Sequence, residues 1–371
     1  MHIPDWPVAG DREIGLLREV LASRHWGGFH PFVADFEQRF AQFQHCQHGI
    51  AVMNGTVSLE AAFAVEELGP GDEVIVPAIS FVSTATAISR AGATPVFVDI
   101  EPYSFNLCPR RVEEAIGPRT KGIVAVHFGG PLANMDALTD IAQRRGIHLY
   151  EDAAHAHGAE WRGKRAGSFG RWGSFSFQNG KVLTAGEGGA LVTNDSDLAA
   201  RFRNFVNLGR SMGGADGASF YHHYTLGTNF RMTALQAAVL TAQLERLPAQ
   251  IAHRERAEKL LRELTANVPW LTWQQVPAEV NVHPHYLLPG RIAGQSRDKF
   301  CQHLKEQGVP CTPFYPHPLY GNPLYQEGGC RIMPCPNAEA CVQDAFWLPH
   351  RLLLADDETI HETASIIRAA A

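Results

Sequence analysis

Short apolar runs alternate with helical patterns over the first half of the chain. Seven runs are almost continuously hydrophobic and predict strands: Gly49–Met53, Glu73–Pro77, Pro95–Asp99, Gly122–His127, Ile147–Glu151, Gly173–Phe177 and Gly189–Thr193. Such runs are typical of a mostly parallel sheet with helices on both faces, and helical periodicity occurs between them at 57–68, 135–145 and 198–205. We therefore predict an α/β fold on one wide, seven-stranded, mostly parallel sheet, with ligands bound where strands end and helices begin.

The alternation stops after Asn194. Helical periodicity over 233–247 and again over 249–264 predicts two helices separated by Pro248, the first with Thr233 as its N-cap. Beyond them come a short strand at 285–288, a helix at 296–307, a proline-rich loop at 310–323 and a last helix from Asp356. We predict a large domain of residues 1–248 and a smaller C-terminal α/β domain of residues 249–371. The glycine-rich stretch 211–218 predicts a loop.

Composition narrows the kind of ligand. The 371 residues are 45% hydrophobic and 19% charged, with a net charge of −6 and no basic run, which argues against a nucleic-acid surface. No long uncharged apolar window predicts a membrane span, and the first residues lack the features of a signal peptide, so we expect a cytoplasmic protein. The seven cysteines contain no CxxC pair in the cluster from Cys311 to Cys341, so we expect no metal site. The ligand is expected to be a small molecule.

Lys181 is the most informative candidate for chemistry. It follows the predicted strand 173–177 after a Gln-Asn-Gly turn and precedes a loop rich in small residues. An amine at such a junction suits a Schiff base with an aldehyde whose phosphate binds close by. The alternatives are an ordinary surface lysine in a turn, or a P-loop, whose Ser or Thr after the lysine is here Val182.

Other candidates lie at the ends of predicted strands. Asn54-Gly55-Thr56 opens a helix after the first strand, so its backbone N–H groups can bind an anion, and Ser176 can add a hydroxyl; Thr56 could equally be only a cap. Asp152 ends the fifth strand, where a carboxylate can keep a pyridine nitrogen protonated or simply cap a helix.

Two further side chains have weaker signals. Phe81 follows the second strand and can stack on a flat ring, with core packing as the alternative. His155 follows Asp152 closely and can contact the ring or its phenolic oxygen, although an isolated histidine at a strand end is commonly a packed residue.

Taken together, the chain resembles the DegT/DnrJ/EryC1/StrS family, the pyridoxal 5′-phosphate (PLP)-dependent aminotransferases of fold type I that act on keto sugars and cyclitols. The resemblance covers nearly the whole chain. The matching motifs are Asn54-Gly-Thr56, Gly69-Pro-Gly-Asp-Glu-Val-Ile-Val-Pro77, Glu151-Asp-Ala-Ala-His155, Ser174-Phe-Ser-Phe177 with Lys181, Leu183-Thr-Ala-Gly-Glu-Gly-Gly189, Leu226-Gly-Thr-Asn-Phe-Arg-Met232 and Trp347-Leu-Pro-His350. Several of them are similar to the branch with glutamine-dependent cyclitol aminotransferases and 3-amino-5-hydroxybenzoate synthase.

The resemblance implies roles for these residues. Lys181 forms the Schiff base with PLP and Asp152 pairs with the pyridine nitrogen, both as catalytic residues. The other implied cofactor contacts are Phe81 at the ring, Gly55, Thr56 and Ser176 at the phosphate, and Asn229, which reaches the phosphate from the partner subunit of a homodimer. The implied substrate contacts are Trp26, Gly28, Tyr315 and His317. Arg231 is a further candidate from its charge and position only: it can bind a donor carboxylate, with a plain surface or interface arginine as the alternative. Where the family usually has Gly-Tyr-Asn-Tyr-Arg, this chain has Gly227-Thr-Asn-Phe-Arg231.

The function implied is transfer of an amino group from glutamine or glutamate to the ketone of a keto sugar or cyclitol. One alternative uses the same cofactor for dehydration and aromatisation, as in 3-amino-5-hydroxybenzoate synthase. Another is a catalytically silent protein, a sensor or scaffold, that retains the fold, because a fold does not fix a function.

Overall fold

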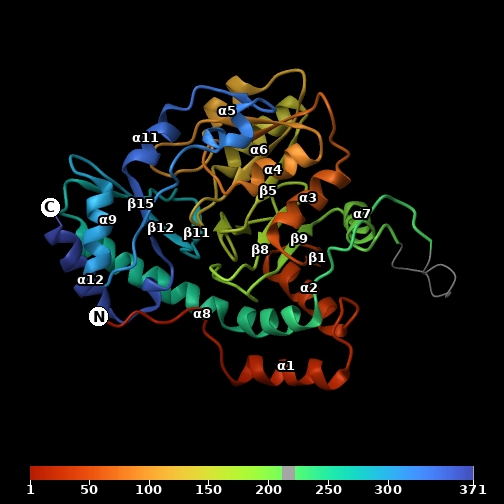
Figure 1. The fold of residues 1–371 in the computed structure, drawn as a ribbon, viewed down its shortest axis with the longest axis horizontal. Helices are drawn as coiled ribbons and strands as arrows, with labels where there is room; N and C mark the ends of the chain where they lie inside the picture. The colour runs from red at the N-terminus through yellow and green to blue at the C-terminus, as the bar shows by residue number, and fades with distance from the viewer. Residues whose placement is uncertain (211–221, 371) are drawn as a thin grey trace.

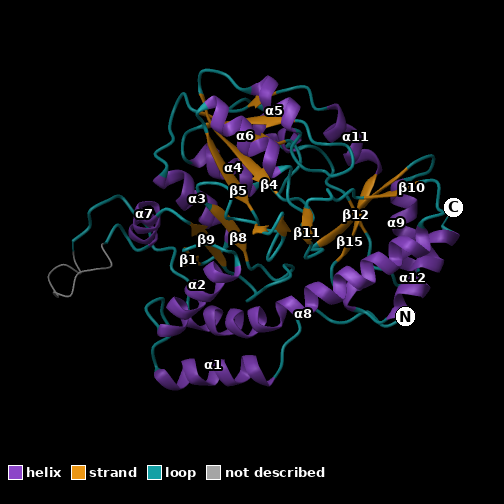
Figure 2. Cartoon of the chain, turned by 180° about the vertical axis from the view of Figure 1, so that it is seen from behind, coloured by secondary structure: helices purple, strands orange, loops and turns teal. Residues whose placement is uncertain are grey.

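The computed structural model describes residues 1–210 and 222–370, and its centre is an eight-stranded sheet (Figures 1 and 2). The glycine-rich stretch 211–218 lies outside the described residues. In spatial order the strands are β1 (His48–Val52), β9 (Gly189–Thr193), β8 (Gly173–Ser176), β5 (His148–Asp152), β4 (Thr120–Val126), β2 (Glu73–Pro77), β3 (Thr94–Val98) and β14 (Arg331–Ile332). From β8 to β14 all pairs are parallel, whereas β9 is antiparallel to both of its neighbours. The predicted mostly parallel sheet and its seven strands are confirmed, and β14 is an eighth strand.

Helices cover both faces of this sheet because both faces are apolar. Alternate residues of one strand belong to different cores: Ile75 packs in the core with α2 and α6, whereas Val74 and Val76 pack in the core with α3, α4 and α7. The helices of this part are α1 (Asp11–Ser23), α2 (Pro31–Phe43), α3 (Gly55–Val65), α4 (Ser83–Arg90), α5 (Pro109–Ala115), α6 (Met135–Arg145) and α7 (Ser196–Val206). The sheet therefore has the layered arrangement that the hydrophobic runs predict.

The predicted break at Pro248 is wrong, because α8 (Ala234–Thr265) runs through it as one helix. Thr233 and Gln236 form the capping box at its start, as the N-cap prediction requires. Pro248 is exposed, while Leu247 and Ile251 on either side are buried. Packing of this buried face outweighs the proline's cost of about 3 kcal/mol. The domain division at 248 therefore falls inside a continuous helix and stays a prediction.

The C-terminal third forms a smaller α/β unit around a four-stranded antiparallel sheet. Its strands, in order, are β10 (Leu271–Trp273), β12 (Leu287–Ile292), β15 (Ala345–Pro349) and β13 (Thr312–Pro313), and its helices are α9 (Arg297–Glu306), α10 (Pro323–Gln326), α11 (Pro336–Asp344) and α12 (Asp357–Ala369). Two of its strands join the larger part: β14 extends the main sheet, and β11 (Val280–Val282) pairs with β6 (Glu160–Trp161), which also pairs with β7 (Lys164–Arg165).

The first residues of the chain also belong to this smaller unit in space. The backbone N–H of His2 donates to Thr359 Oγ1 of α12, and Ile3 packs against the core formed by α9 and α12. Figure 1 shows both chain ends beside these helices. No helix in the described ranges is both long and apolar enough to cross a membrane.

Candidate active site

A cavity of about 630 Å³ opens at the carboxyl ends of β4, β5 and β8, where the small unit meets the large one. Its lining joins residues from both parts of the chain, with Leu287 and Trp347 arriving from β12 and β15. The predicted residues that line it are Gly55, Thr56, Phe81, Asp152, His155, Ser176, Lys181 and Tyr315. The structure thus brings together residues as far apart in sequence as Asn54 and Trp347.

Lys181 enters the cavity from a tight turn after β8. Its backbone N–H donates to the carbonyl of Gln178 at 2.8 Å, which closes the turn. Its Nζ lies 4.4 Å from the centre of the Tyr286 ring, and no ion pair among the described residues involves it. The amine is therefore held over an aromatic face without a carboxylate partner, an arrangement that leaves it available to a ligand.

Asp152 presents a buried carboxylate at the end of β5 and is 6% exposed. Thr84 of α4 donates from Oγ1 to Oδ2 at 2.6 Å, and the N–H of Ala154 donates to Oδ1 at 3.2 Å. Thr84 itself is fully buried and shares a hydrogen bond of 2.8 Å with Ser80. These bonds fix the position of the carboxylate in the cavity lining.

The N-terminus of α3 forms a corner of small residues against β8. Asn54 caps the helix by accepting from the N–H of Val57 at 2.9 Å. A Cβ added to Gly55 would lie 2.6 Å from the Cβ of Ser176, so only glycine allows this approach. Thr56 Oγ1 and Ser83 Oγ are 2.7 Å apart beside it. Hydroxyls and free N–H groups at a helix N-terminus suit a phosphate.

The two histidines after Asp152 are buried and neutral. Burial, and then the charge of Lys181, lower the pKa of His155 well below its usual value and the pKa of His157 to about 3. His155 Nδ1 accepts from the N–H of Gly129 at 3.3 Å, and its ring centre lies 4.4 Å from that of Tyr286. His157 Nε2 donates to the carbonyl of Ser176 at 2.9 Å and so supports the strand that leads to Lys181. His157 lies behind the cavity, not in its lining.

Aromatic side chains form the remaining walls. Phe81 is 60% exposed although it lines the cavity, so one face of its ring is open to a flat ligand. Tyr315 and Trp347 pack against each other with ring centres 5.5 Å apart. Burial raises the pKa of Tyr315, so its hydroxyl stays protonated at neutral pH. Sequence reasoning assigned no role to Tyr286 or Trp347, because only the fold of the C-terminal unit brings them here.

Five predicted site residues lie outside this lining. Gly28 and Arg231 lie together at a small separate cavity, where Arg231 Nη1 donates to Asn207 Oδ1 at 2.7 Å. Trp26 is 52% exposed and Asn229 is also exposed. His317, in the proline-rich loop, shares a hydrogen bond of 3.0 Å with the carbonyl of Pro318. Within one chain, these residues do not reach Lys181.

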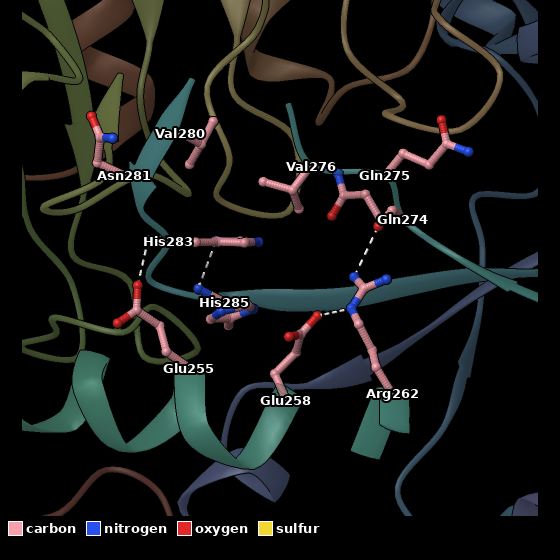
Figure 3. Close-up of a pocket in the computed structure, with 10 residues that line it drawn as sticks. All are labelled: Glu255, Glu258, Arg262, Gln274, Gln275, Val276, Val280, Asn281, His283 and His285. Carbon is pink, nitrogen blue, oxygen red and sulfur yellow. Dashed lines mark hydrogen bonds and ion pairs between the residues drawn. The ribbon is translucent and has the colours of Figure 1, made fainter. Parts of the chain in front are cut away.

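A second cavity, of about 590 Å³, is lined by residues of α8 and of the segment 274–285 (Figure 3). His283 and His285 face it with ring centres 3.7 Å apart, whereas Tyr286 and Leu287 face the first cavity. Its charged groups have partners: Arg262 binds Glu258, and Glu255 accepts from the N–H of His283 at 3.1 Å. No cluster of three or more His, Cys, Asp or Glu residues in the described ranges is placed to hold a metal ion.

The first cavity fits PLP. An unpaired lysine amine, a buried carboxylate, an open aromatic face and an anion-binding corner at a helix N-terminus are the groups that this aldehyde, pyridine ring and phosphate require. The second cavity has no comparable set.

Comparisons with known proteins agree with this chemistry. A family model, the DegT/DnrJ/EryC1/StrS aminotransferase family, matches residues 7–367. The chain is 39% identical to a 3-amino-5-hydroxybenzoate synthase from Amycolatopsis mediterranei, over 100% of this chain and 97% of the relative. It is 35% identical to an L-glutamine:2-deoxy-scyllo-inosose aminotransferase from Streptomyces kanamyceticus, over 97% and 92%. A crystal structure of 3-amino-5-hydroxybenzoic acid synthase matches with a TM-score of 0.94 at 38% identity, covering 100% and 98% of the two chains.

Proposed function

Because the chain belongs to the DegT/DnrJ/EryC1/StrS family of PLP-dependent aminotransferases, we propose that it moves an amino group from glutamine or glutamate to the ketone of a keto sugar or cyclitol. The observation that carries this proposal is the meeting of Lys181, Asp152 and the Gly55–Ser176 corner in one cavity. The relative named for glutamine and 2-deoxy-scyllo-inosose supports this donor and this class of acceptor.

The roles of the residues follow from their surroundings. Lys181 holds the cofactor and moves a proton at its Nζ, because this amine has no ion-pair partner in the described part of the chain and lines the cavity. Asp152 keeps the pyridine nitrogen protonated, since hydrogen bonds from Thr84 and Ala154 hold its carboxylate in place in the cavity lining. When bound, PLP supplies the electron sink that makes the donor's α-hydrogen acidic.

The remaining cavity residues bind and orient. Gly55, Thr56 and Ser176 hold the phosphate, and Phe81 stacks on the ring. His155 contacts the ring edge as a neutral imidazole, because burial disfavours its protonation. Tyr315 faces the substrate from the small unit.

The direct test replaces the lysine. Lys181→Ala should lose the visible absorption band of the bound cofactor and at least about 1,000-fold in turnover, because both attachment and proton transfer depend on its amine. Lys164→Ala is the matched control, since Lys164 is exposed on β7 and lies against Phe169, outside the cavity lining. Retention of wild-type turnover in Lys181→Ala refutes the proposed role of Lys181, whereas a wild-type protein with neither turnover nor a visible cofactor band favours the silent alternative.

The donor and acceptor are identified in two half-reactions. Glutamine or glutamate should convert the visible band of the wild-type protein to the pyridoxamine spectrum, and a ketone from a panel of keto sugars and inososes should restore it. Product analysis then distinguishes the reactions: an aminated ring that keeps its hydroxyl groups supports transamination, whereas loss of water and aromatisation contradict it. If neither donor changes the band, the proposed donors are wrong.

We also propose that the active protein is a homodimer with shared sites. Asn229, Trp26 and Arg231 lie outside the cavity of their own chain, and large apolar side chains around them are open, with Leu226 96% exposed and Phe29 56% exposed. Such a surface is typical of an interface. A partner subunit that covers it brings Asn229 to the phosphate corner of the other chain.

Subunit mixing tests this arrangement. Lys181→Ala and Asn229→Ala proteins should each be nearly inactive, but a mixture should regain about a quarter of wild-type activity, because half of the dimers are hybrids with one intact site. A mixture that stays as inactive as its components, although hybrids form, contradicts shared sites.

A further inference from the structure

The turn that carries Lys181 is held from behind by side chains distant in sequence. Trp6 Nε1 donates to the carbonyl of Asn179 at 2.9 Å. His350 Nε2 lies 3.0 Å from the carbonyl of Gly180. The two carbonyls immediately before Lys181 are therefore both bonded, one to the N-terminal segment and one to the turn after β15. Fixing these peptide planes fixes where the Lys181 side chain starts.

Arg254 of α8 determines which way the His350 ring donates. Its Nη2 lies 3.2 Å from His350 Nδ1. A guanidinium group has only donors, so Nδ1 must accept, and the hydrogen of the neutral imidazole is then on Nε2, facing Gly180. Burial, and then the charge of Arg254, keep the pKa of His350 well below its usual value, so the ring stays neutral.

Arg254 lowers the folding stability of the protein, because its charge is buried without an ion-pair partner in the described ranges. It is fully buried, and its Nε and Nη1 have no hydrogen-bond partner among the described residues. Burial lowers its pKa to about 9, and no acid pairs with it in the described ranges. A buried unpaired charge costs several kcal/mol, whereas an apolar side chain of similar size fills the space without this cost. Packing alone therefore does not account for Arg254.

His350, which Arg254 orients, also contacts the Tyr286 ring that lies beside the Lys181 amine. The Trp6 ring meets His350 edge-on with ring centres 4.5 Å apart, and it lies 5.6 Å from the Arg254 guanidinium. His350 in turn stacks at 6.0 Å on Tyr286, whose ring centre is 4.4 Å from Lys181 Nζ. His350 thus links the backbone before Lys181 with the aromatic face under its amine.

We propose that Arg254, His350 and Trp6 are positioning residues that hold the turn 178–181, so that the Lys181 amine projects into the cavity in one orientation. This inference rests on the proposed role of Lys181. It assigns a task to the N-terminal segment and to α8: both support the reactive lysine from outside the cavity. None of the three residues lines the cavity, so none is expected to contact the substrate.

Amide hydrogen exchange of the protein without cofactor tests the support directly. Gly180 N–H donates to Gln178 Oε1 at 2.7 Å and Lys181 N–H donates to the Gln178 carbonyl, so both amides report on the turn. Trp6→Phe keeps an aromatic ring against His350 but removes the donor to Asn179. It should speed exchange of these two amides about 2- to 10-fold, the effect of losing one hydrogen bond.

Trp270→Phe is the matched control, because Trp270 is also half-buried but packs against Phe300 of α9. It should leave exchange at 178–182 unchanged. Equal exchange in the Trp6→Phe, Trp270→Phe and wild-type proteins overturns the proposal. This readout needs no turnover, so it stays independent of the proposed reaction, which fails separately if Lys181→Ala remains active.

A pair of substitutions at His350 separates positioning from packing. His350→Gln offers an amide oxygen to Arg254 and an N–H to Gly180, so it should keep slow exchange and most of kcat. His350→Leu removes both bonds and should lower kcat at least about 10-fold with KM for the donor changed less than about 3-fold. Equal kcat in these two variants contradicts the proposal; if His350→Leu does not fold, the Trp6→Phe exchange result decides.

Discussion

Buried neutral histidines make the stability of this protein dependent on pH, and His157 is the clearest case. It is fully buried, its Nε2 donates to Ser176, and its Nδ1 has no partner among the described residues. Burial, and then the charge of Lys181, lower its pKa to about 3, against about 6.5 in an unfolded chain. Because the folded pKa lies below the unfolded one, the unfolded state binds the proton first. The stability that neutral His157 contributes is therefore complete above about pH 6.5 and is lost as the pH falls toward 3.

The magnitude follows from this gap. At pH 5 the unfolded imidazole gains about 2 kcal/mol from protonation, which is about 1.5 pH units at about 1.36 kcal/mol per unit. Between about pH 6 and pH 4, each such histidine adds about 1.4 kcal/mol per pH unit to the slope of stability against pH. His157→Gln removes the titrating group and keeps an N–H for the Ser176 carbonyl, so it should lower the slope by this amount.

Urea unfolding of the protein without cofactor, at several values between pH 8 and pH 4.5, measures the slope. The difference at pH 8 reports only the packing cost of the substitution, because the imidazole is neutral in both states there. Burial also lowers the pKa of His283 to about 3, at the second cavity, so His283→Gln should show the same change and the double variant about twice it. Parallel stability curves for wild type and His157→Gln refute this reasoning.

Three further predictions concern single contacts. Thr84→Val should lower the free energy of unfolding by about 1.5–3 kcal/mol and weaken cofactor binding, because Asp152 loses a hydrogen bond from Thr84. Thr86→Val on the same helix is the control, since the Thr86 hydroxyl lies 3.5 Å from a carbonyl. It should change the free energies of unfolding and of cofactor binding by less than about 0.5 kcal/mol in equilibrium titrations. Phe81→Ala should weaken cofactor binding by about 0.5–1.5 kcal/mol with little loss of folding stability, since the ring is 60% exposed; equal affinity in a spectroscopic titration contradicts stacking. Glu151→Ala should cost at least about 3–5 kcal/mol in urea unfolding, because the N–H groups of Gly167, Phe169 and Gly170 at 2.7, 2.7 and 2.8 Å lose their acceptor; a smaller loss means that water replaces the carboxylate.

The central sheet could be predicted from the sequence because its strands are buried on both faces. Continuous apolar runs such as 73–77 and 122–127 are short enough for strands, and their flanking turn residues favour a buried strand over a buried helix. β14 could not be predicted, because Arg331–Ile332 is two residues long and Ile332 is 50% exposed. β14 pairs with β3 only because the C-terminal part of the chain folds back against the main sheet. The residues around β14 carry no hydrophobic pattern that predicts this pairing.

The cavity was predictable to the extent that it is built from strand ends. Asp152 is the last residue of β5 and Lys181 follows β8, and parallel strands bring their carboxyl ends to one edge. Tyr286 and Trp347 come from the antiparallel sheet of the small unit, so their arrival depends on how the two parts pack. The helix break at Pro248 was wrong for a related reason: local propensity gave way to the buried face of α8.

The electrostatics of the cavity explain why these features occur together. Lys181 has no acidic partner among the residues that the structure describes, so a protonated His155 or His157 beside it would place like charges side by side in a buried region. Burial and fixed hydrogen bonds keep both rings neutral, which leaves Asp152 as the buried carboxylate of the lining. The same burial that protects this charge pattern at neutral pH destabilises the fold in acid. The loss of stability in acid is therefore a consequence of how the site is built. His157→Gln should reduce this loss without changing any residue that lines the cavity.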